Sequence, residues 1–320
     1  MEIRALNPAR VGAMASKKRV AVTNFKNDRV GLSGKIEAEL ASKRLNGRAY
    51  FTLLSRKDLN KILAEQKLQS SEMVDASTAT RVGEIIGAQA IITGEVALAN
   101  AESSSYRKNT KECLGYYKNG RCAKWHFYQI RCNTTKASVS ANINIIDVAK
   151  GTIIYADTYV KNYSGDSCRD NYNGSGQILS KAQALNRLTS QIATDFVYKL
   201  TPNYTYITVT LLDSIKLESA TDREKKEFEN ALKYIEATRY DRAKKILSKL
   251  IDLFDGKSYV VDYDMGIVYE ATGDLERAKE FYTMADNVTP EPIDEVNEAM
   301  IRIDRLIAKQ NEAQAQIHAE

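Results

Sequence analysis

The sequence feature that most constrains the fold is a strict two-residue alternation near the middle of the chain. The apolar residues Val139, Ala141, Ile143 and Ile145 alternate with Ser and Asn. This period predicts a β-strand with one buried face and one solvent-exposed face. After the turn signal Lys150-Gly151 the chain continues with strand-like residues 152–160, so we expect the two segments to form an antiparallel hairpin.

This hairpin predicts a pairing of the cysteines. If the chain turns at Lys150-Gly151, opposed residues have numbers that sum to about 300, and Cys132 lies opposite Cys168 to within one residue. Cys113 and Cys122 are then left to pair with each other, on either side of a second hairpin signal, Asn119-Gly120. A slip of one residue or a β-bulge would change this assignment.

The cysteines also bear on the cellular compartment. All four lie in one stretch, residues 113–168, that is rich in Tyr, Asn, Ser and Gly. The stretch lacks the paired Cys-x2-Cys spacing of a zinc site, and such clustering is typical of disulfides, although four reduced thiols in the cytosol are the alternative. Neither a signal peptide nor an apolar run of ~20 residues is visible. We therefore expect an oxidising compartment and a leader that has been removed.

The first two thirds of the chain mix strand and helix patterns. The expected class is α+β, a mixed sheet flanked by helices, in a domain over residues 19–213. Residues 1–18 are expected to form an extended arm, and disulfide-stapled insertions are expected at about 101–136 and 162–176. The expected strands are 19–25, 50–54, 90–99, 139–146, 152–160 and 204–212, and the expected helices are 32–45 (ended by Gly47), one that follows Ser55, 77–86 and 177–200.

Residues 220–312 have a purely helical pattern. One set of small, aromatic and proline residues falls at the spacing of a tetratricopeptide (TPR) unit, which is about 34 residues long. Small residues let two helices approach, a glycine makes the turn between them, and the tyrosines fill the groove. An earlier, weaker copy involves Ala231, Tyr234, Ala243 and Leu247, and a last helix from Ile293 is expected to cap the array. The set comprises Gly266, Tyr269, Gly273, Ala278, Tyr282, Ala285 and Pro290.

No residue pattern indicates catalysis, a cofactor or a metal. The two histidines, His126 and His318, have no neighbouring Cys or carboxylate that would form a triad or a metal site. Asp28 and Asp58 are better explained as turn and helix-start residues than as an acid–base pair. We therefore predict a protein that is not an enzyme.

Three further features have structural interpretations. Gly87 is expected to cap a helix, and Gly94 to mark a strand irregularity. The aromatic cluster at residues 125–128 could be a ligand platform, but the small core of a stapled loop is the favoured interpretation. The net charge of +5 and the lack of a basic stripe interleaved with aromatics argue against nucleic-acid binding.

An ordered set of segments resembles the curli-secretion channel (CsgG-like) family. It comprises Lys18-Arg19-Val20-Ala21-Val22-Thr23-Asn24-Phe25, Leu53-Leu54-Ser55-Arg56-Lys57-Asp58-Leu59, Ile85-Ile86-Gly87-Ala88-Gln89-Ala90-Ile91-Ile92-Thr93-Gly94-Glu95-Val96 and Asn142-Ile143-Asn144-Ile145-Ile146-Asp147-Val148. The resemblance covers about residues 7–212. It implies a periplasmic domain that is tethered at the outer membrane by a lipidated N-terminal cysteine and that commonly assembles into rings.

This chain departs from the family pattern in two ways. No cysteine stands near residue 1, so a lipid anchor is absent or lies outside this sequence. The channel members insert membrane-spanning hairpins at about the positions of the two insertions. Residues 103–111 and 164–171 carry too many charged and polar residues for strands that face lipid. We therefore predict a member that does not form a pore.

The leading hypothesis is a periplasmic scaffold or ring component of an outer-membrane-associated assembly, such as a flagellar motor or a secretion system. Its expected partners are proteins docked on the TPR-like repeats and further copies of itself, with no nucleic acid and no transmembrane segment. Two alternatives stay open: a periplasmic regulator of a cell-wall enzyme and a CsgG-type outer-membrane secretion pore.

Overall fold

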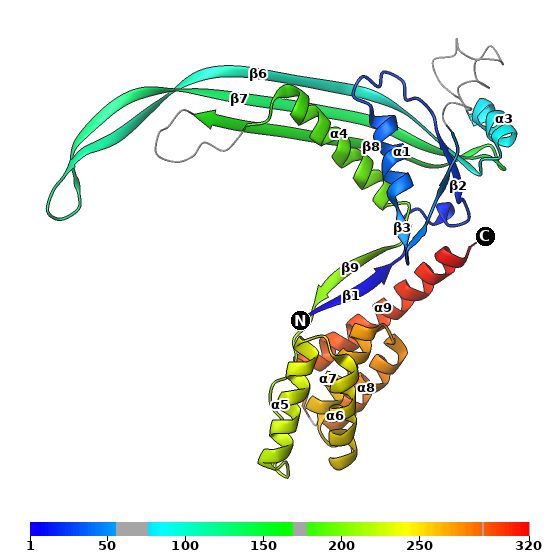
Figure 1. Cartoon of the computed structure of the whole chain (residues 1–320), viewed down its shortest axis with the longest axis vertical. Helices are drawn as coiled ribbons and strands as arrows, with labels where there is room; N and C mark the ends of the chain where they lie inside the picture. The colour runs from blue at the N-terminus through cyan, green and yellow to red at the C-terminus, as the bar shows by residue number, and fades with distance from the viewer. Residues whose placement is uncertain (56–75, 169–177, 290, 320) are drawn as a thin grey trace. The chain divides into compact units, whose positions relative to one another are not determined.

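The computed structural model describes residues 1–55, 76–168, 178–289 and 291–319. The chain forms two compact units (Figure 1). One consists of residues 13–201 and the other of residues 1–12 together with 202–319. The predicted α+β class is confirmed, with a mixed sheet flanked by helices and a C-terminal helical region. None of the described helices has the length and apolar character that crossing a bilayer requires.

The sheet of the first unit has five strands in the order β5-β2-β6-β7-β8. The short β2 pairs in parallel with β5 and β6, whereas β6, β7 and β8 form an antiparallel meander. The strands are β2 (Arg19–Val22), β5 (Thr52–Leu53), β6 (Ala90–Tyr116), β7 (Cys122–Asp147) and β8 (Thr152–Cys168).

Helix α4 (Lys181–Tyr198) covers the apolar face that the alternation predicted. Its Phe196 ring packs on Tyr155 and Tyr159 of β8, with ring centroids 6.1 Å apart in both pairs. Tyr155 and Tyr159 lie opposite Ile145 and Ala141 of β7, so all four side chains share the face under α4. Helix α1 (Leu32–Ser42) packs beside α4.

Helix α3 (Ala76–Ile86) ends at Gly87, which has φ +68° and acts as the helix cap that the sequence predicted. Gly83 of the same helix lies against the side chains of Val148 and Ile91. Ile91, Val148 and Ile86 belong to one apolar cluster, so α3 covers the face of the sheet that carries Ile91.

One helix end differs from the prediction. Helix α1 ends at Ser42, and Gly47 lies beyond it, in the turn of a small hairpin of β3 (Arg44–Leu45) and β4 (Arg48–Ala49). Asn46 and Gly47 both have positive φ, 50° and 80°, as the turn of a two-residue hairpin requires. The Asn-Gly pair therefore makes a hairpin turn and does not end the helix.

The segment expected as an insertion at 101–136 is a continuation of the sheet. Strands β6 and β7 stay paired from Ala90↔Asp147 to Tyr116↔Cys122, and they run on beyond β8 as a two-stranded ribbon (Figure 1). Gly94 is in register with Ile143, and the register shifts lie elsewhere, the nearest between Val96 and Leu98. The predicted irregularity at Gly94 is therefore wrong.

The second unit includes the N-terminus. Strand β1 (Glu2–Asn7) pairs antiparallel with β9 (Asn203–Thr208) in a separate two-stranded sheet. Ile3, Ala5 and Leu6 are buried. Residues 1–18 are therefore not an extended arm, and β9 does not complete the main sheet. The expectation failed because the partner of β1 lies about 200 residues away in the chain, beyond the reach of local pattern.

The rest of this unit is helical, and consecutive helices pack on one another. One apolar cluster joins the first three helices, and another joins the last three with β1. Two hydrogen bonds connect Ala9 to Gln316 of the last helix. The Gln316 side-chain oxygen accepts from the Ala9 backbone N–H at 2.6 Å, and the Gln316 side-chain nitrogen donates to the Ala9 carbonyl at 3.2 Å. The helices are α5 (Asp222–Glu236), α6 (Tyr240–Leu253), α7 (Tyr259–Thr272), α8 (Leu275–Val288) and α9 (Asp294–His318).

Candidate functional site

The far end of the β6–β7 ribbon is mostly exposed. Strand β8 ends at Cys168, opposite Cys132 of β7. A shallow groove lies beside the end of β8. It is lined by residues 103–105 of β6, residues 133–135 of β7, and residues 178–180 and 183 at the start of α4. In the described part of the chain, β8 pairs with no residue of β7 beyond this point, and the side chains there are exposed or half-buried except Ile130, which is buried. We call residues 106–131 the ribbon tip.

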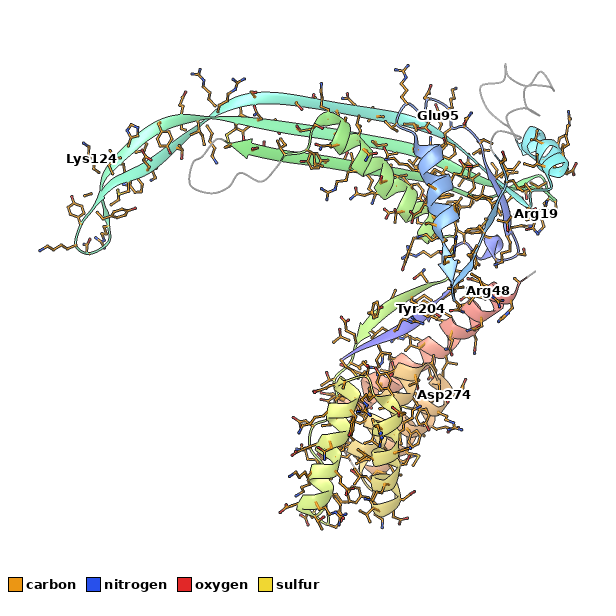
Figure 2. All side chains as sticks on the ribbon, viewed as in Figure 1. Arg19, Arg48, Glu95, Lys124, Tyr204 and Asp274 are labelled. Carbon is orange, nitrogen blue, oxygen red and sulfur yellow. A yellow bond between two sulfur atoms is a disulfide. The ribbon has the colours of Figure 1, made fainter. Side chains whose placement is uncertain are left out.

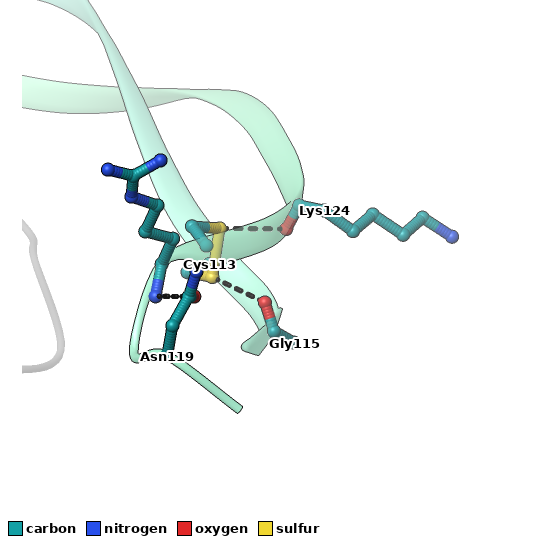
Figure 3. Close-up of a disulfide and its surroundings, with 6 residues drawn as sticks. Cys113, Gly115, Asn119 and Lys124 are labelled. Atoms are coloured by element: carbon teal, nitrogen blue, oxygen red, sulfur yellow. Dashed lines mark hydrogen bonds between the residues drawn. A yellow bond between two sulfur atoms is a disulfide. The ribbon is translucent and has the colours of Figure 1, made fainter. Parts of the chain in front are cut away.

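Two disulfides hold the ribbon tip, and both are the expected pairs. Cys132–Cys168 joins β7 to the end of β8 at the base of the tip, and Cys113–Cys122 joins β6 to β7 near its end. Between Cys113 and Cys122 the chain turns at Gly120, which has φ +79° (Figure 3). The Asn119 side chain accepts a hydrogen bond from the Arg121 N–H at 3.1 Å and supports this turn (Figure 3).

The ribbon tip concentrates positive charge. It carries seven Lys and Arg residues and a single carboxylate, Glu112, so its net charge is +6, while the whole chain carries +5. In the described part of the chain, no ion pair involves any of these seven side chains. The seven are Arg107, Lys108, Lys111, Lys118, Arg121, Lys124 and Arg131.

Aromatic side chains lie among these charges. Phe127 is 71% exposed, and Trp125, the only tryptophan of the chain, is 46% exposed. The ammonium group of Lys111 lies 4.3 Å from the centre of the Trp125 ring. Lys124, which precedes Trp125 in the sequence, lies towards the end of the ribbon (Figure 2). Further exposed apolar and aromatic side chains are Tyr106, Leu114, Tyr116 and Tyr117.

Two expectations from the sequence are therefore wrong. The cluster at residues 125–128 is not the core of a stapled loop, because a two-stranded ribbon has no third layer to cover it, and only Tyr128 is partly buried. The expected lack of a basic stripe interleaved with aromatics also fails at the tip. The charge count over 106–131 could have revealed it, but the average over the whole chain hides it.

In the helical unit, most residues of the TPR-like spacing lie in the contact between α7 and α8. A Cβ on Gly266 would lie 2.5 Å from the Tyr282 ring, so glycine is what allows this close approach. Tyr269 stacks on Phe281 with centroids 5.3 Å apart, and Gly273 has φ +84° at the end of α7. Ala278, Tyr282 and Ala285 are fully buried. Pro290 lies outside the described residues.

An extended segment of the same chain lies along α7. The Tyr263 hydroxyl donates to the Thr210 carbonyl at 2.9 Å, and the Leu212 N–H donates to the Asp264 carboxyl at 3.1 Å. Val209 belongs to the apolar cluster of α7 and α8. Side chains of α7 thus hold the backbone of residues 209–212.

Helix α7 also carries buried carboxyl groups. Glu270 forms an ion pair with Arg302 of α9 at 2.9 Å and accepts a hydrogen bond from the Tyr282 hydroxyl. Asp262 is fully buried, and neither of its carboxyl oxygens has a hydrogen-bond partner among the described residues. Burial raises its pKa to about 7. Burial also raises the pKa of Asp264 well above its usual range.

The residues considered for catalysis or metal binding do not come together. His126 lies on the tip, stacked on Tyr128, and His318 is the last residue of α9. Asp28 accepts hydrogen bonds from the N–H groups of Leu32 and Ser33 and so caps the start of α1. Asp58 lies outside the described residues. Among those described, no three His, Cys, Asp or Glu side chains are grouped so that they could hold a metal ion.

Comparison with known proteins gives a match for most of the first unit. Residues 9–195 match the family described as curli production assembly/transport component CsgG. No curated protein matches the chain.

Solved structures that match part of the chain include three bacterial proteins. The PelC dodecamer from Paraburkholderia phytofirmans is 14% identical, with a TM-score of 0.29, and the match covers 62% of this chain and 97% of that one. The LpoB C-terminal domain from Salmonella enterica is 12% identical, with a TM-score of 0.27 and coverages of 48% and 95%. The lipoprotein GNA1162 from Neisseria meningitidis is 12% identical, with a TM-score of 0.29 and coverages of 56% and 97%. At such identities and TM-scores these likenesses support no conclusion about function.

Proposed function

From the premise that this chain belongs to the CsgG family of curli production assembly/transport components, we propose that it is a non-enzymatic periplasmic scaffold of an outer-membrane-associated assembly. The observation that carries the proposal is the family match over residues 9–195, which is more than half of the chain. Copies of the chain associate through the main sheet into a ring, and the helical unit docks protein partners.

The disulfides support a compartment outside the cytoplasm. All four cysteines are joined in two disulfides, and disulfides persist mainly in oxidising compartments. The periplasm is such a compartment, and the family name refers to assembly and transport of curli.

The outer edge of β8 supports self-association. Strand β8 is 17 residues long and is the last strand of the sheet, paired on one side with β7. A long open edge is a template for a strand of another chain. Ile153 and Val160 of β8 are more than half exposed, so an approaching copy would find apolar as well as backbone contacts.

The helical unit has the features expected of a docking module. Its α5–α6 and α7–α8 hairpins follow each other. The close packing at Gly266 and the left-handed cap at Gly273 fit a TPR-like repeat. Residues 209–212 already lie along α7, so a partner docked there would have to displace this segment. A partner that binds to a helix surface away from this part of α7 would leave residues 209–212 in place.

The experiment that tests the scaffold role is the mass of the purified protein in solution, measured by mass photometry. We expect a closed oligomer, and we expect Val160→Lys to shift it towards the monomer, because a lysine on an edge strand discourages pairing. The matched control is Ile301→Lys, which places the same charge on a similarly exposed apolar residue of α9. A wild-type chain that stays monomeric at high concentration would instead favour the monomeric regulator of a cell-wall enzyme.

A further inference from the structure

We propose that the ribbon tip docks on an anionic bilayer surface, with its Lys and Arg side chains at the lipid phosphates and its exposed aromatic side chains in the headgroup region. This binding site goes beyond the scaffold role, and it does not depend on ring formation. It follows from the charge, the aromatic content and the placement of residues 106–131.

The charge of the tip calls for an anionic partner. The 26 residues of the tip include seven basic side chains and one carboxylate. None of the seven forms an ion pair with a carboxylate of the described residues. Arg107 lies directly opposite Arg131 in the register of β6 and β7. Like charges at opposed positions destabilise a strand pair. An anion between these two guanidinium groups would remove this repulsion.

The aromatic residues point to a lipid surface. Trp125, Tyr116 and Tyr117 are exposed amphipathic rings, a type that gathers at the level of lipid headgroups. Phe127 and Leu114 are more than half exposed and wholly apolar, and a bilayer interface would shield them from water. Basic and aromatic side chains together favour binding at an anionic membrane surface.

The shape of the tip favours a membrane over other polyanions. Proteins that bind single-stranded nucleic acid use a positively charged groove in which bases stack on aromatic side chains. The tip is a narrow two-stranded ribbon that projects from its unit (Figure 2). A projecting tip can reach a flat surface, and its charges keep it from entering the hydrocarbon region, since charged residues in the bilayer interior are disfavoured.

Trp125 is a built-in reporter, because it is the only tryptophan of the chain. The experiment mixes the full-length oxidised protein with vesicles of phosphatidylcholine, either alone or with phosphatidylglycerol. We expect the Trp125 emission to shift to the blue, and the protein to co-sediment, with the anionic vesicles only. Added salt should weaken binding, because it screens exposed charges. Lipid-attached quenchers near the headgroups should act more strongly than quenchers at the bilayer centre.

Two variants separate the parts of the site. The charge variant Lys118→Glu/Arg121→Glu/Lys124→Glu should lower vesicle affinity by at least about tenfold, since each basic residue near an anionic surface contributes to binding. Its matched control reverses three exposed lysines of α5, Lys225→Glu/Lys226→Glu/Lys233→Glu, and should bind as the wild type does. Phe127→Ser should reduce the blue shift more than it reduces the salt-dependent binding.

Several outcomes would overturn the proposal. These are an unchanged Trp125 emission with anionic vesicles, an equal loss of binding in the α5 control, and strongest quenching at the bilayer centre. Binding to heparin without binding to vesicles would identify a different polyanion as the partner. Circular dichroism and the masses of disulfide-linked peptides verify that each variant is folded and oxidised. A tip that fails to bind lipid in a protein that still forms the oligomer would leave the scaffold role intact.

Discussion

The backbone N–H of Leu212 donates a hydrogen bond of 3.1 Å to Oδ1 of Asp264, a carboxyl that is fully buried in α7. The second oxygen, Oδ2, has no hydrogen-bond partner in the part of the chain that the structure describes. A buried carboxylate with one hydrogen bond is strongly disfavoured, and burial accordingly raises the pKa of Asp264 well above its usual range. The protonated carboxyl can hold the extended segment at residues 209–212 without burying a charge.

Replacing this carboxyl tests the hydrogen bond. Asp264→Asn can keep an oxygen acceptor for the Leu212 N–H and bears no charge, so we expect it to fold with at least the wild-type stability. Asp264→Leu removes the acceptor and leaves a partly buried N–H unsatisfied, which should cost about 1–3 kcal/mol. Urea unfolding followed by circular dichroism measures both. Equal stability of the two variants would show that the hydrogen bond contributes nothing.

Asp262 should make the stability of the helical unit depend on pH. Its pKa is raised by burial to about 7 in the folded protein, against a reference value of 3.8. The folded state therefore binds the proton more tightly than the unfolded state. The stabilisation is fully present below about pH 4 and is lost as the pH rises to about 7. This contribution to the free energy of unfolding is at most ~4 kcal/mol, because a difference of one pKa unit corresponds to about 1.4 kcal/mol.

The variant Asp262→Asn should flatten this pH profile. Between pH 5 and pH 8 the free energy of unfolding should fall less in the variant than in the wild type, and the variant should be the more stable protein at pH 8. Asp286→Asn, an exposed carboxylate on α8, is the control and should follow the wild-type profile. Parallel profiles of wild type and Asp262→Asn would contradict the prediction.

The ion pair between Arg302 and Glu270 should be critical for the contact between α9 and α7. Glu270 is fully buried, so removing its partner leaves an uncompensated charge. We expect Arg302→Met to destabilise the protein by ~3–5 kcal/mol. The matched control is Lys279→Met on α8, which breaks an exposed pair with Asp304 of α9 and should cost less than ~1 kcal/mol. Thermal unfolding would show a large loss for the first variant and a small one for the second.

The local sequence pattern was sufficient to predict the main sheet, but it was insufficient to predict the separate sheet of β1 and β9. The alternation from Val139 to Ile145 predicted a buried face and a register, and that register brings Cys132 opposite Cys168. It could not reveal that Ile3, Ala5 and Leu6 form a strand, since three apolar residues near a terminus are a weak signal. Their partner strand was assigned to the wrong sheet for the same reason, because pairing over such a distance leaves no local trace.

The candidate site was harder to predict than the fold. Aromatic residues between two cysteines are usual in a small core, and burial cannot be inferred from residue type alone. Whether Trp125 and Phe127 are covered depends on where β8 ends and where α4 begins, and both points lie far from these two residues in the sequence. A local charge count would have indicated the site, because the surplus of basic residues over 106–131 exceeds that of the whole chain.

Gly94 and Gly115, two glycines of the same strand, should respond differently to replacement by alanine. A Cβ on Gly94 would lie 2.6 Å from the backbone oxygen of Asn142 and 2.7 Å from the Phe25 ring, and the backbone oxygen cannot move without breaking strand pairing. At Gly115, no atom of the described residues lies within 4 Å of such a Cβ, and neither glycine has positive φ.

Overpacking of this kind usually costs about 1–3 kcal/mol, so Gly94→Ala should lower the melting temperature clearly. Gly115→Ala should leave it unchanged or raise it slightly, because glycine in a strand is itself unfavourable. The double variant Gly94→Ala/Phe25→Leu should recover only part of the loss, since the leucine relieves the ring contact while the contact with Asn142 remains. Full recovery of the melting temperature would show that the Phe25 ring alone requires a glycine at position 94. The contact with the Asn142 backbone of β7 would then not explain the loss of stability.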